Sequence, residues 1–155
     1  MGEVLMVGKK PAGRLDCSWP PSPEFIVGVR QFNAGEYFAC HETLEGVWLA
    51  ERGAMRRFYQ GVLQVGVGLY HLQRGNEKGA LILLARGKEL LRPFAPLCLG
   101  IDVARLLCGA EEVLQTLQTL GLQRTQGLAP GLFPRIRVMV EEEETGGRSR
   151  GAASG

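Results

Sequence analysis

Apolar residues recur at every third or fourth position through most of the chain, which is the period of an amphipathic helix rather than the alternation of a strand. Five segments with this pattern are separated by glycine or proline. They run from residue 22 to a break at 33–35, and then over about 36–51, 54–73, 77–91 and 102–120. Short connections between consecutive helices favour antiparallel neighbours. The pattern therefore predicts an all-α, single-domain bundle of about five antiparallel helices.

Capping residues support these boundaries. Ser22 before Pro23 is a helix start, because the serine oxygen can accept from a free amide and proline fits the first turn. Asn76 is expected to cap the fourth helix in the same way. Gly35 and Gly75 occupy corresponding breaks 40 residues apart, which predicts repeat-like helical hairpins similar to tetratricopeptide units. Two such units are too few for a solenoid, which needs about three.

The segments outside the helices predict a domain with a tail at each end. Residues 1–21 contain glycine and proline without an apolar period, so we expect an extended or disordered arm. Residues 135–140 (RIRVMV) alternate, which predicts a short strand or an extended strap. Residues 141–155 begin with four glutamates and have no large apolar residue, so we expect a disordered tail. The helical domain is predicted to span 22–140.

Charge and composition exclude several classes of protein. Residues 22–120 hold ten Lys or Arg and ten Asp or Glu, whereas a nucleic-acid-binding domain usually carries a basic stripe. No apolar run approaches the eighteen or so residues of a membrane span, and the N-terminus lacks a secretory pattern. Neither nucleic acid nor a membrane is therefore expected as a partner. Reduced thiols and a cytoplasmic location are expected, because the cysteines are widely spaced without a CxxC pair, at Cys17, Cys40, Cys98 and Cys108.

Both histidines of the chain lie in helical segments beside other polar residues. His41 and Glu45 are four residues apart, about 40° around the helix, and they share a stripe with Tyr37 and Trp48 that we expect to face the core. The next helix carries a polar stripe on an otherwise apolar sequence, at Arg57, Gln60, Gln64 and His71. A buried amide or imidazole without a partner costs on the order of 1 to 3 kcal/mol. We therefore expect the two polar stripes to meet between the second and third helices.

Three interpretations of this constellation are open. The first is a buried hydrogen-bond network that fixes the register of the helices. The second is a metal site, in which His41, Glu45 and His71 hold a zinc, manganese or iron ion and Glu42 is the candidate catalytic base. The pattern HExxE differs from the HExxH of zinc proteases, so its third ligand has to come from another helix. The third is an apolar pocket that binds a small molecule or a peptide helix.

Other residues are predicted to line the same pocket. Arg57 either holds an anionic substrate or forms a salt bridge with Glu42 or Glu45. Large aromatic residues at helical spacing are more often core anchors than ligand stackers. The pocket is expected to include Tyr37, Trp48, Arg57, Gln60, Gln64 and Asn76.

Glycine makes up 22 of the 155 residues, roughly twice its average usage. Gly61 and Gly68 fall inside a predicted helix, where glycine costs about 1 kcal/mol relative to alanine. Close approach of a neighbouring backbone would offset this cost. We expect the helix over 36–51 to approach there and to bring His41 and Glu45 near the polar stripe.

The ordered spacing of these residues resembles a known family. The pattern is FNxGxYFxCHExLExxW over residues 32–48, RxxQGxxQ over 57–64 and HxxxGNxxGA over 71–80. It is similar, over about 25–91, to the bacterial, archaeal and plastid family of domain-of-unknown-function number 309. The resemblance implies an all-helical bundle with signature positions at His41, Glu45, Gln60, Gln64, His71 and Asn76.

The resemblance also implies a function, because the family is often labelled a predicted metal-dependent hydrolase. Many members resemble YFExHE, whereas this chain has Ala39 in place of the first of those glutamates. If that glutamate is a ligand in other members, its role falls here to Glu42 and Glu45.

Two functional hypotheses follow. The leading one is a metal-dependent hydrolase of unknown substrate, with a divalent metal ion as cofactor. The alternative is a non-enzymatic, tetratricopeptide-like interaction module whose polar cluster is a structural hydrogen-bond network. The partner is an unidentified small molecule or protein, and a homo-oligomer is compatible with the sequence.

Overall fold

The structure is a computed structural model that describes residues 17–18, 20–120 and 130–139. Most of the predicted arm and the whole predicted tail lie outside these residues. The long helices of the described part are α2 (Pro23–Asn33), α3 (Tyr37–Ala50), α4 (Arg56–Gln73), α5 (Glu77–Leu91) and α6 (Val103–Leu120). The short elements are the 3-10 helices η1 (Arg92–Phe94) and η3 (Pro130–Leu132), and the strands β1 (Leu97–Cys98) and β2 (Ile101–Asp102).

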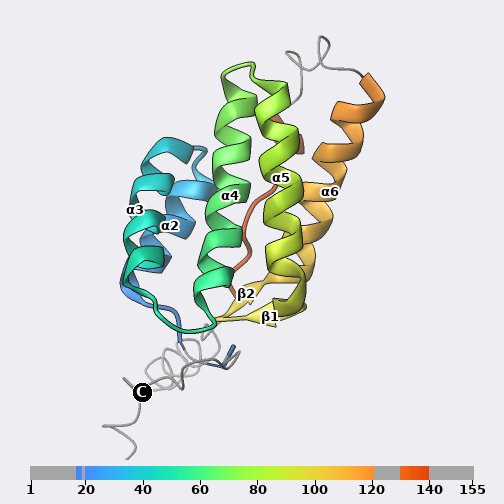
Figure 1. The fold of residues 1–155 in the computed structure, drawn as a ribbon. Coiled ribbons are helices and arrows are strands. Elements are labelled where there is room, and N and C mark those ends of the chain that lie inside the picture. The colour runs from blue at the N-terminus through green and yellow to red at the C-terminus, as the bar shows by residue number, and fades with distance from the viewer. Residues whose placement is uncertain (1–16, 19, 121–129, 140–155) are drawn as a thin grey trace, which may run out of the picture.

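Helices α3, α4 and α5 lie side by side with α4 in the middle (Figure 1). Helix α2 packs on α3, and α6 packs on α5. The observed helix boundaries agree with the predicted ones within two residues, so the predicted all-α bundle is confirmed. Within the described residues, no helix is both long and apolar enough to cross a membrane.

The predicted caps are in place. The Ser22 hydroxyl accepts from the Phe25 amide at 3.1 Å, and Pro23 takes the first position of α2. The Asn76 side chain accepts from the Gly79 amide at 3.0 Å, which caps α5. These bonds satisfy amides that a helix N-terminus otherwise leaves without a partner.

The breaks at Gly35 and Gly75 have the same conformation. Both glycines are left-handed, with φ of +78° and +81°. In each turn the glycine amide donates to the carbonyl three positions earlier (3.0 and 3.1 Å), and the next amide donates to the carbonyl five positions earlier (2.9 and 2.8 Å). The Gln73 side chain donates to the Gly35 carbonyl at 3.1 Å and so joins the two turns. The repeat-like character of the two hairpins therefore extends to their hydrogen bonds.

Residues 135–139 form the predicted strap. Asn33, at the end of α2, brackets the buried Ile136: its Oδ1 accepts from the Ile136 amide at 2.7 Å, and its Nδ2 donates to the Ile136 carbonyl at 2.9 Å. Further along, Val138 pairs with Ile101 of β2 in an antiparallel bridge. An asparagine side chain thus serves as the strand partner for the first half of the strap.

The hairpin of β1 and β2 was not expected from the sequence. Its turn is formed by Leu99 and Gly100, both with positive φ (51° and 73°). Strands of two residues are too short to show an alternating pattern. The hairpin nevertheless matters for the fold, because it receives the end of the strap.

The glycines of α4 correct an expectation. A Cβ atom at Gly61 would lie 2.7 Å from Leu91 Cγ, and one at Gly68 would lie 3.0 Å from Leu84 Cγ. On α5, a Cβ atom at Gly87 would lie 3.0 Å from the Gly61 carbonyl oxygen. The close approach was expected between the helices that carry His41 and Gln64, but it joins α4 to α5.

The expectation of four reduced thiols is also corrected. Cys17 and Cys98 form a disulfide across 81 positions of sequence, and the Cys17 carbonyl accepts from the Leu99 amide at 2.9 Å. Cys40 is buried and Cys108 is exposed, and both are free thiols. The wide spacing of the cysteines along the sequence did not predict their distance in space, because the fold brings β1, which contains Cys98, beside Cys17.

Candidate functional site

His41 and Glu45 lie at the surface of α3 rather than in the core, where they were expected. Their side chains are 36% and 47% exposed, and His41 Nε2 lies 4.0 Å from Glu45 Oε1. Each step of four residues turns about 40° around a helix. The series that starts at the buried Tyr37 therefore drifts to partly exposed at His41 and to exposed at Glu45.

His71 lies in the last turn of α4, beside the junction with α5. Asn76 Nδ2 lies 3.3 Å from His71 Nδ1. Asn76 Oδ1 accepts from the Gly79 amide. A Cβ atom at Gly79 would lie 2.7 Å from Asn76 Nδ2 and 3.2 Å from His71 Cδ2. The spacing HxxxGNxxG thus has a structural reason: an imidazole, a cap and a glycine pack together at one helix junction.

This contact fixes the chemistry of the His71 ring. Because Asn76 Oδ1 is held by the Gly79 amide, its Nδ2 donates to His71 Nδ1. A neutral imidazole that accepts at Nδ1 carries its proton on Nε2. A metal ion at His71 Nδ1 would have to displace the Asn76 side chain, so this nitrogen is engaged in the turn in the present arrangement.

The two histidines are linked by a row of rings at the α3 and α4 surface. Phe38 lies 6.4 Å from the His41 ring and 5.8 Å from the Tyr70 ring, and Tyr70 lies 6.2 Å from the His71 ring. Phe38 is 55% exposed. We call Phe38, His41, Tyr70 and His71 the ring surface. It is a partly apolar surface rather than a set of converging ligands.

The predicted metal set does not fit this arrangement. Among the described residues, no group of three His, Cys, Asp or Glu side chains is placed to hold one ion. Glu42, the candidate base, is exposed on α3. His41 and Glu45 are near one another, but His71 is engaged by Asn76. We therefore derive no hydrolytic step from these residues.

Gln60 and Gln64 face α5 rather than α3, contrary to expectation. They line a groove of about 550 Å³ together with Ala85, Arg86, Glu89 and Leu90. Both glutamines are half-buried, and Gln64 Oε1 is buried without a hydrogen-bond partner in the described part of the chain. No hydrogen bond between described residues joins them to His41 or Glu45. We call this hollow the glutamine groove.

Two of the remaining predicted pocket residues, Tyr37 and Trp48, serve the fold. Tyr37 is 3% exposed and meets Phe32 edge-on at 5.5 Å, and its burial raises the pKa of its hydroxyl to about 12. Trp48 is half-buried, with the guanidinium of Arg56 4.5 Å above its ring and Arg56 Nε donating to its carbonyl at 3.3 Å. Arg57 is exposed. Its neighbour Arg56, and not Arg57 itself, is the arginine that contacts α3.

Two parts of this surface were missed at the level of sequence. Tyr70 was overlooked because it precedes His71 on a helix with many apolar residues. The α5 wall of the glutamine groove, with Arg86 and Glu89, was overlooked because the partner of the glutamine stripe was assigned to α3. Gly61 and Gly87 could have identified α5 as the helix that packs closely on α4. Glycines inside two helices are expected where the backbones of those helices approach each other.

A known protein family matches part of the helical region just described. Residues 25–83 match the model of a family described as a domain of unknown function, DUF309. The predicted resemblance is confirmed over that segment, which contains α2, α3, α4 and the first half of α5.

Two curated relatives are similar to the chain. One is the uncharacterized protein YpuF of Bacillus subtilis (strain 168), 34% identical over 93 residues, which cover 58% of this chain and 53% of the relative. The other is an uncharacterized protein of Aquifex aeolicus (strain VF5), 25% identical over 121 residues, which cover 73% of this chain and 31% of the relative. The chain thus spans about half of the first relative and about a third of the second.

Proposed function

We propose that this protein is a non-enzymatic helical binding module that takes a peptide segment of another protein into the glutamine groove. The observation that carries the proposal is Gln64, a half-buried side chain that lines the groove. Its Oε1, like Oε1 of Gln31 on α2, is a buried acceptor without a hydrogen-bond partner among the described residues. A buried polar atom without a hydrogen bond is costly. A bound ligand with an N–H donor would remove that cost.

The geometry of the groove favours a peptide backbone as the ligand. Each glutamine amide offers both donors and an acceptor, and each peptide unit offers one donor and one acceptor. Gln60 and Gln64 are separated by about 6 Å along α4, close to the roughly 7 Å that separates every second residue of an extended chain. Arg86 and Glu89 on the opposite wall can contact charged side chains of the peptide.

The position of the polar residues also supports binding over a purely structural role. A structural network would bury these side chains and pair them with one another. Instead His41 is partly exposed, Gln60 and Gln64 line an open groove, and the ring surface lies on the other flank of α4. Only His71 and Asn76 are engaged in holding a turn.

A display screen tests the proposal. The full chain and its Gln60→Ala/Gln64→Ala variant are exposed to the same library of random twelve-residue peptides, and the enriched peptides are titrated by amide NMR. The matched control is Gln118→Ala, which removes an exposed glutamine of α6.

The wild-type and control proteins should enrich the same peptides, with shifts at α4 and α5, and the double variant should lose them. Circular dichroism and thermal unfolding establish that the double variant is folded. The proposal is overturned if the wild type enriches nothing, or if a folded double variant enriches the same peptides.

The second candidate is the metal-dependent hydrolase. One observation favours it: His41 Nε2 and Glu45 Oε1 lie 4.0 Å apart on an exposed helix face, where two ligands can approach one ion. Metal analysis of untagged protein, beside His41→Ala/His71→Ala, tests it. Stoichiometric metal in the wild type alone would support this candidate, and no metal in either protein would remove it. A cytoplasmic location and a homo-oligomer stay predictions.

A further inference from the structure

A second hollow lies on a different part of the molecule, between α6 and the segment that leads into the strap. It has a volume of about 730 Å³, within the range of small-molecule sites. Its α6 wall carries Arg105, Cys108 and Glu112, and its other wall is formed by residues 131–137. In Figure 1 the strap runs behind α4 and α5.

The two walls are held close together by a glycine. A Cβ atom at Gly109 would lie 2.6 Å from Pro134 Cβ, so the strap segment rests directly on α6 at this point. The strap is fixed beyond it by the two hydrogen bonds between Asn33 and Ile136. The hollow is therefore part of the ordered fold.

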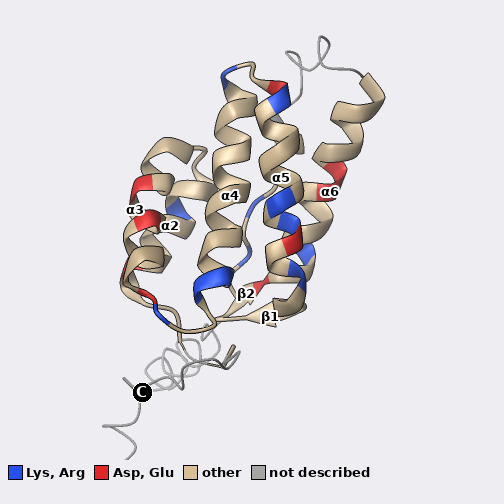
Figure 2. Cartoon of the chain, in the orientation of Figure 1, with Lys and Arg blue, Asp and Glu red and all other residues tan. Residues whose placement is uncertain are grey.

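The charge of the hollow is positive. Arg105, Arg135 and Arg137 line it against a single carboxylate, that of Glu112. Because alternate residues of an extended segment point to the same side, Arg135 and Arg137 lie on one side of the strap while Ile136 is buried. Figure 2 shows the basic positions along the strap. Arg135 also donates to the Asn33 carbonyl at 3.1 Å, which fixes one of its five donors.

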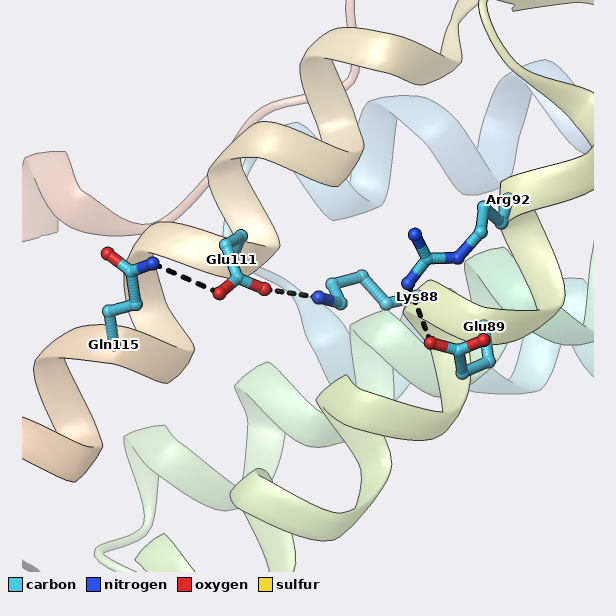
Figure 3. A network of polar contacts seen from close by, with 5 residues as sticks. All are labelled: Lys88, Glu89, Arg92, Glu111 and Gln115. Carbon is cyan, nitrogen blue, oxygen red and sulfur yellow. Dashed lines mark hydrogen bonds and ion pairs between the residues drawn. The ribbon is translucent and has the colours of Figure 1, made fainter.

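Basic residues near the hollow form ion pairs, whereas two arginines of the hollow form none with the described residues. Lys88 pairs with Glu111 across α5 and α6, and Arg92 pairs with Glu89 at 2.7 Å (Figure 3). Among the described residues, the guanidinium groups of Arg105 and Arg137 have no ion pair. Three arginines thus face one carboxylate in the hollow, and two of the three have no ion-pair partner in the described part of the protein.

We infer that this hollow binds a small phosphate-bearing anion. Guanidinium groups present planar pairs of donors that match phosphate oxygens, and they keep their charge at any physiological pH. An anion bound among the three would reduce the excess positive charge that the single carboxylate of Glu112 leaves in the hollow. The site lies on α6 and the strap, outside the segment that matches the family, and it is independent of the glutamine groove.

Cys108 provides a built-in reporter for the test. Its exposed thiol lines the hollow, whereas Cys40 is buried and serves as an internal reference. Sodium pyrophosphate is titrated into the full chain by calorimetry, and alkylation of Cys108 by neutral iodoacetamide is followed by mass spectrometry. Sodium chloride at equal ionic strength corrects for screening.

The wild type should bind pyrophosphate and protect Cys108, and Arg105→Gln/Arg137→Gln should bind at least about tenfold more weakly. Arg30→Gln removes an exposed arginine of α2 and should bind as the wild type does. The changed side chains are exposed, so circular dichroism should show all three proteins folded. The inference is overturned if the wild type binds no more than chloride accounts for, or if the double variant binds equally well.

Discussion

The two flanks of α4 are built in different ways. Toward α5, glycines on both helices let the backbones approach, and a Cβ atom at Gly87 would lie 3.0 Å from both the Gly61 oxygen and the Val65 nitrogen. Toward α2 and α3, the helix packs through large side chains, and a Cβ atom at Gly66 would make ordinary contacts of 3.6 Å with Phe32 and 3.8 Å with Cys40. The packed glycine positions of the α5 flank therefore tolerate little change, while the α3 flank has room for a methyl group at Gly66.

The largest expected effect comes from adding one methyl group to the α5 flank. Gly87→Ala should lower the free energy of unfolding by about 2 kcal/mol. The added Cβ would lie 2.6 Å from Val65 Cγ2 and 3.0 Å from two backbone atoms of α4, so the backbone has to move together with the valine. Gly66→Ala, on the other flank, should be neutral or stabilising by up to about 1 kcal/mol, because alanine favours the helix. Urea unfolding of both variants measures the difference. Equal losses in the two variants would contradict the proposed difference between the flanks.

Alkaline pH should lower the stability of the protein, because two tyrosine hydroxyls are buried in its core. Burial raises the pKa of Tyr37 and of Tyr59 to about 12, from an ordinary value near 10. Between these values the unfolded chain has released its tyrosine protons while the folded protein has not. The contribution of these two hydroxyls to stability is therefore retained below pH 10 and lost as the pH rises from 10 to 12.

The expected loss is about 2 kcal/mol by pH 10.5 for the two tyrosines together. It is measured by urea unfolding between pH 8 and pH 11.5. Tyr37→Phe/Tyr59→Phe should show a smaller loss, because phenylalanine has no proton to release. If the double variant and the wild type lose stability in parallel, burial of these hydroxyls is not the cause.

Next in size is the turn that joins α4 to α5. Asn76→Ala removes the cap of α5 and the contact with His71, and it should cost about 1 kcal/mol. Asn76→Asp keeps the acceptor for the Gly79 amide but loses the donor to His71, so it should recover most of the stability. Thermal unfolding compares the two variants, and equal losses would show that the cap is not the source of the effect.

The smallest expected effect is at His41. His41→Gln should change the free energy of unfolding by less than about 0.5 kcal/mol, as is usual for a surface substitution, because the side chain is 36% exposed. A buried hydrogen-bond network would instead predict a loss of 1 kcal/mol or more. The same urea experiment decides between a surface pair and a buried network. A loss of 1 kcal/mol or more would show that His41 and Glu45 belong to a structural hydrogen-bond network.

The elements were predictable because their signals are local. Apolar period, caps and breaking glycines act within a few residues of one another, so the ends of α5 and the caps at Ser22 and Asn76 were correctly placed. The strap was predictable from alternation in its own six residues. The strap's partner Asn33 was not, because a bond across 103 positions leaves no local pattern.

The candidate site was predicted less well, for a geometric reason. A small angular error around each helix changes which neighbour a side chain meets. The drift of 40° per four residues carries Glu45 to solvent, and the same kind of shift turns Gln60 and Gln64 toward α5. The disulfide between Cys17 and Cys98 was missed because spacing along the chain does not measure distance in space.

The sequence by itself determined the helices, their caps, the two equivalent glycine turns and the resemblance to the DUF309 family. Only the tertiary structure decided which helices the glycines join, that His71 serves a turn, and that the arginines of α6 and the strap share one hollow. Helix formation depends on hydrogen bonds four residues apart. Which side chains meet in a site depends on how each helix is rotated and packed against its neighbours. That packing is determined by contacts between residues distant in sequence.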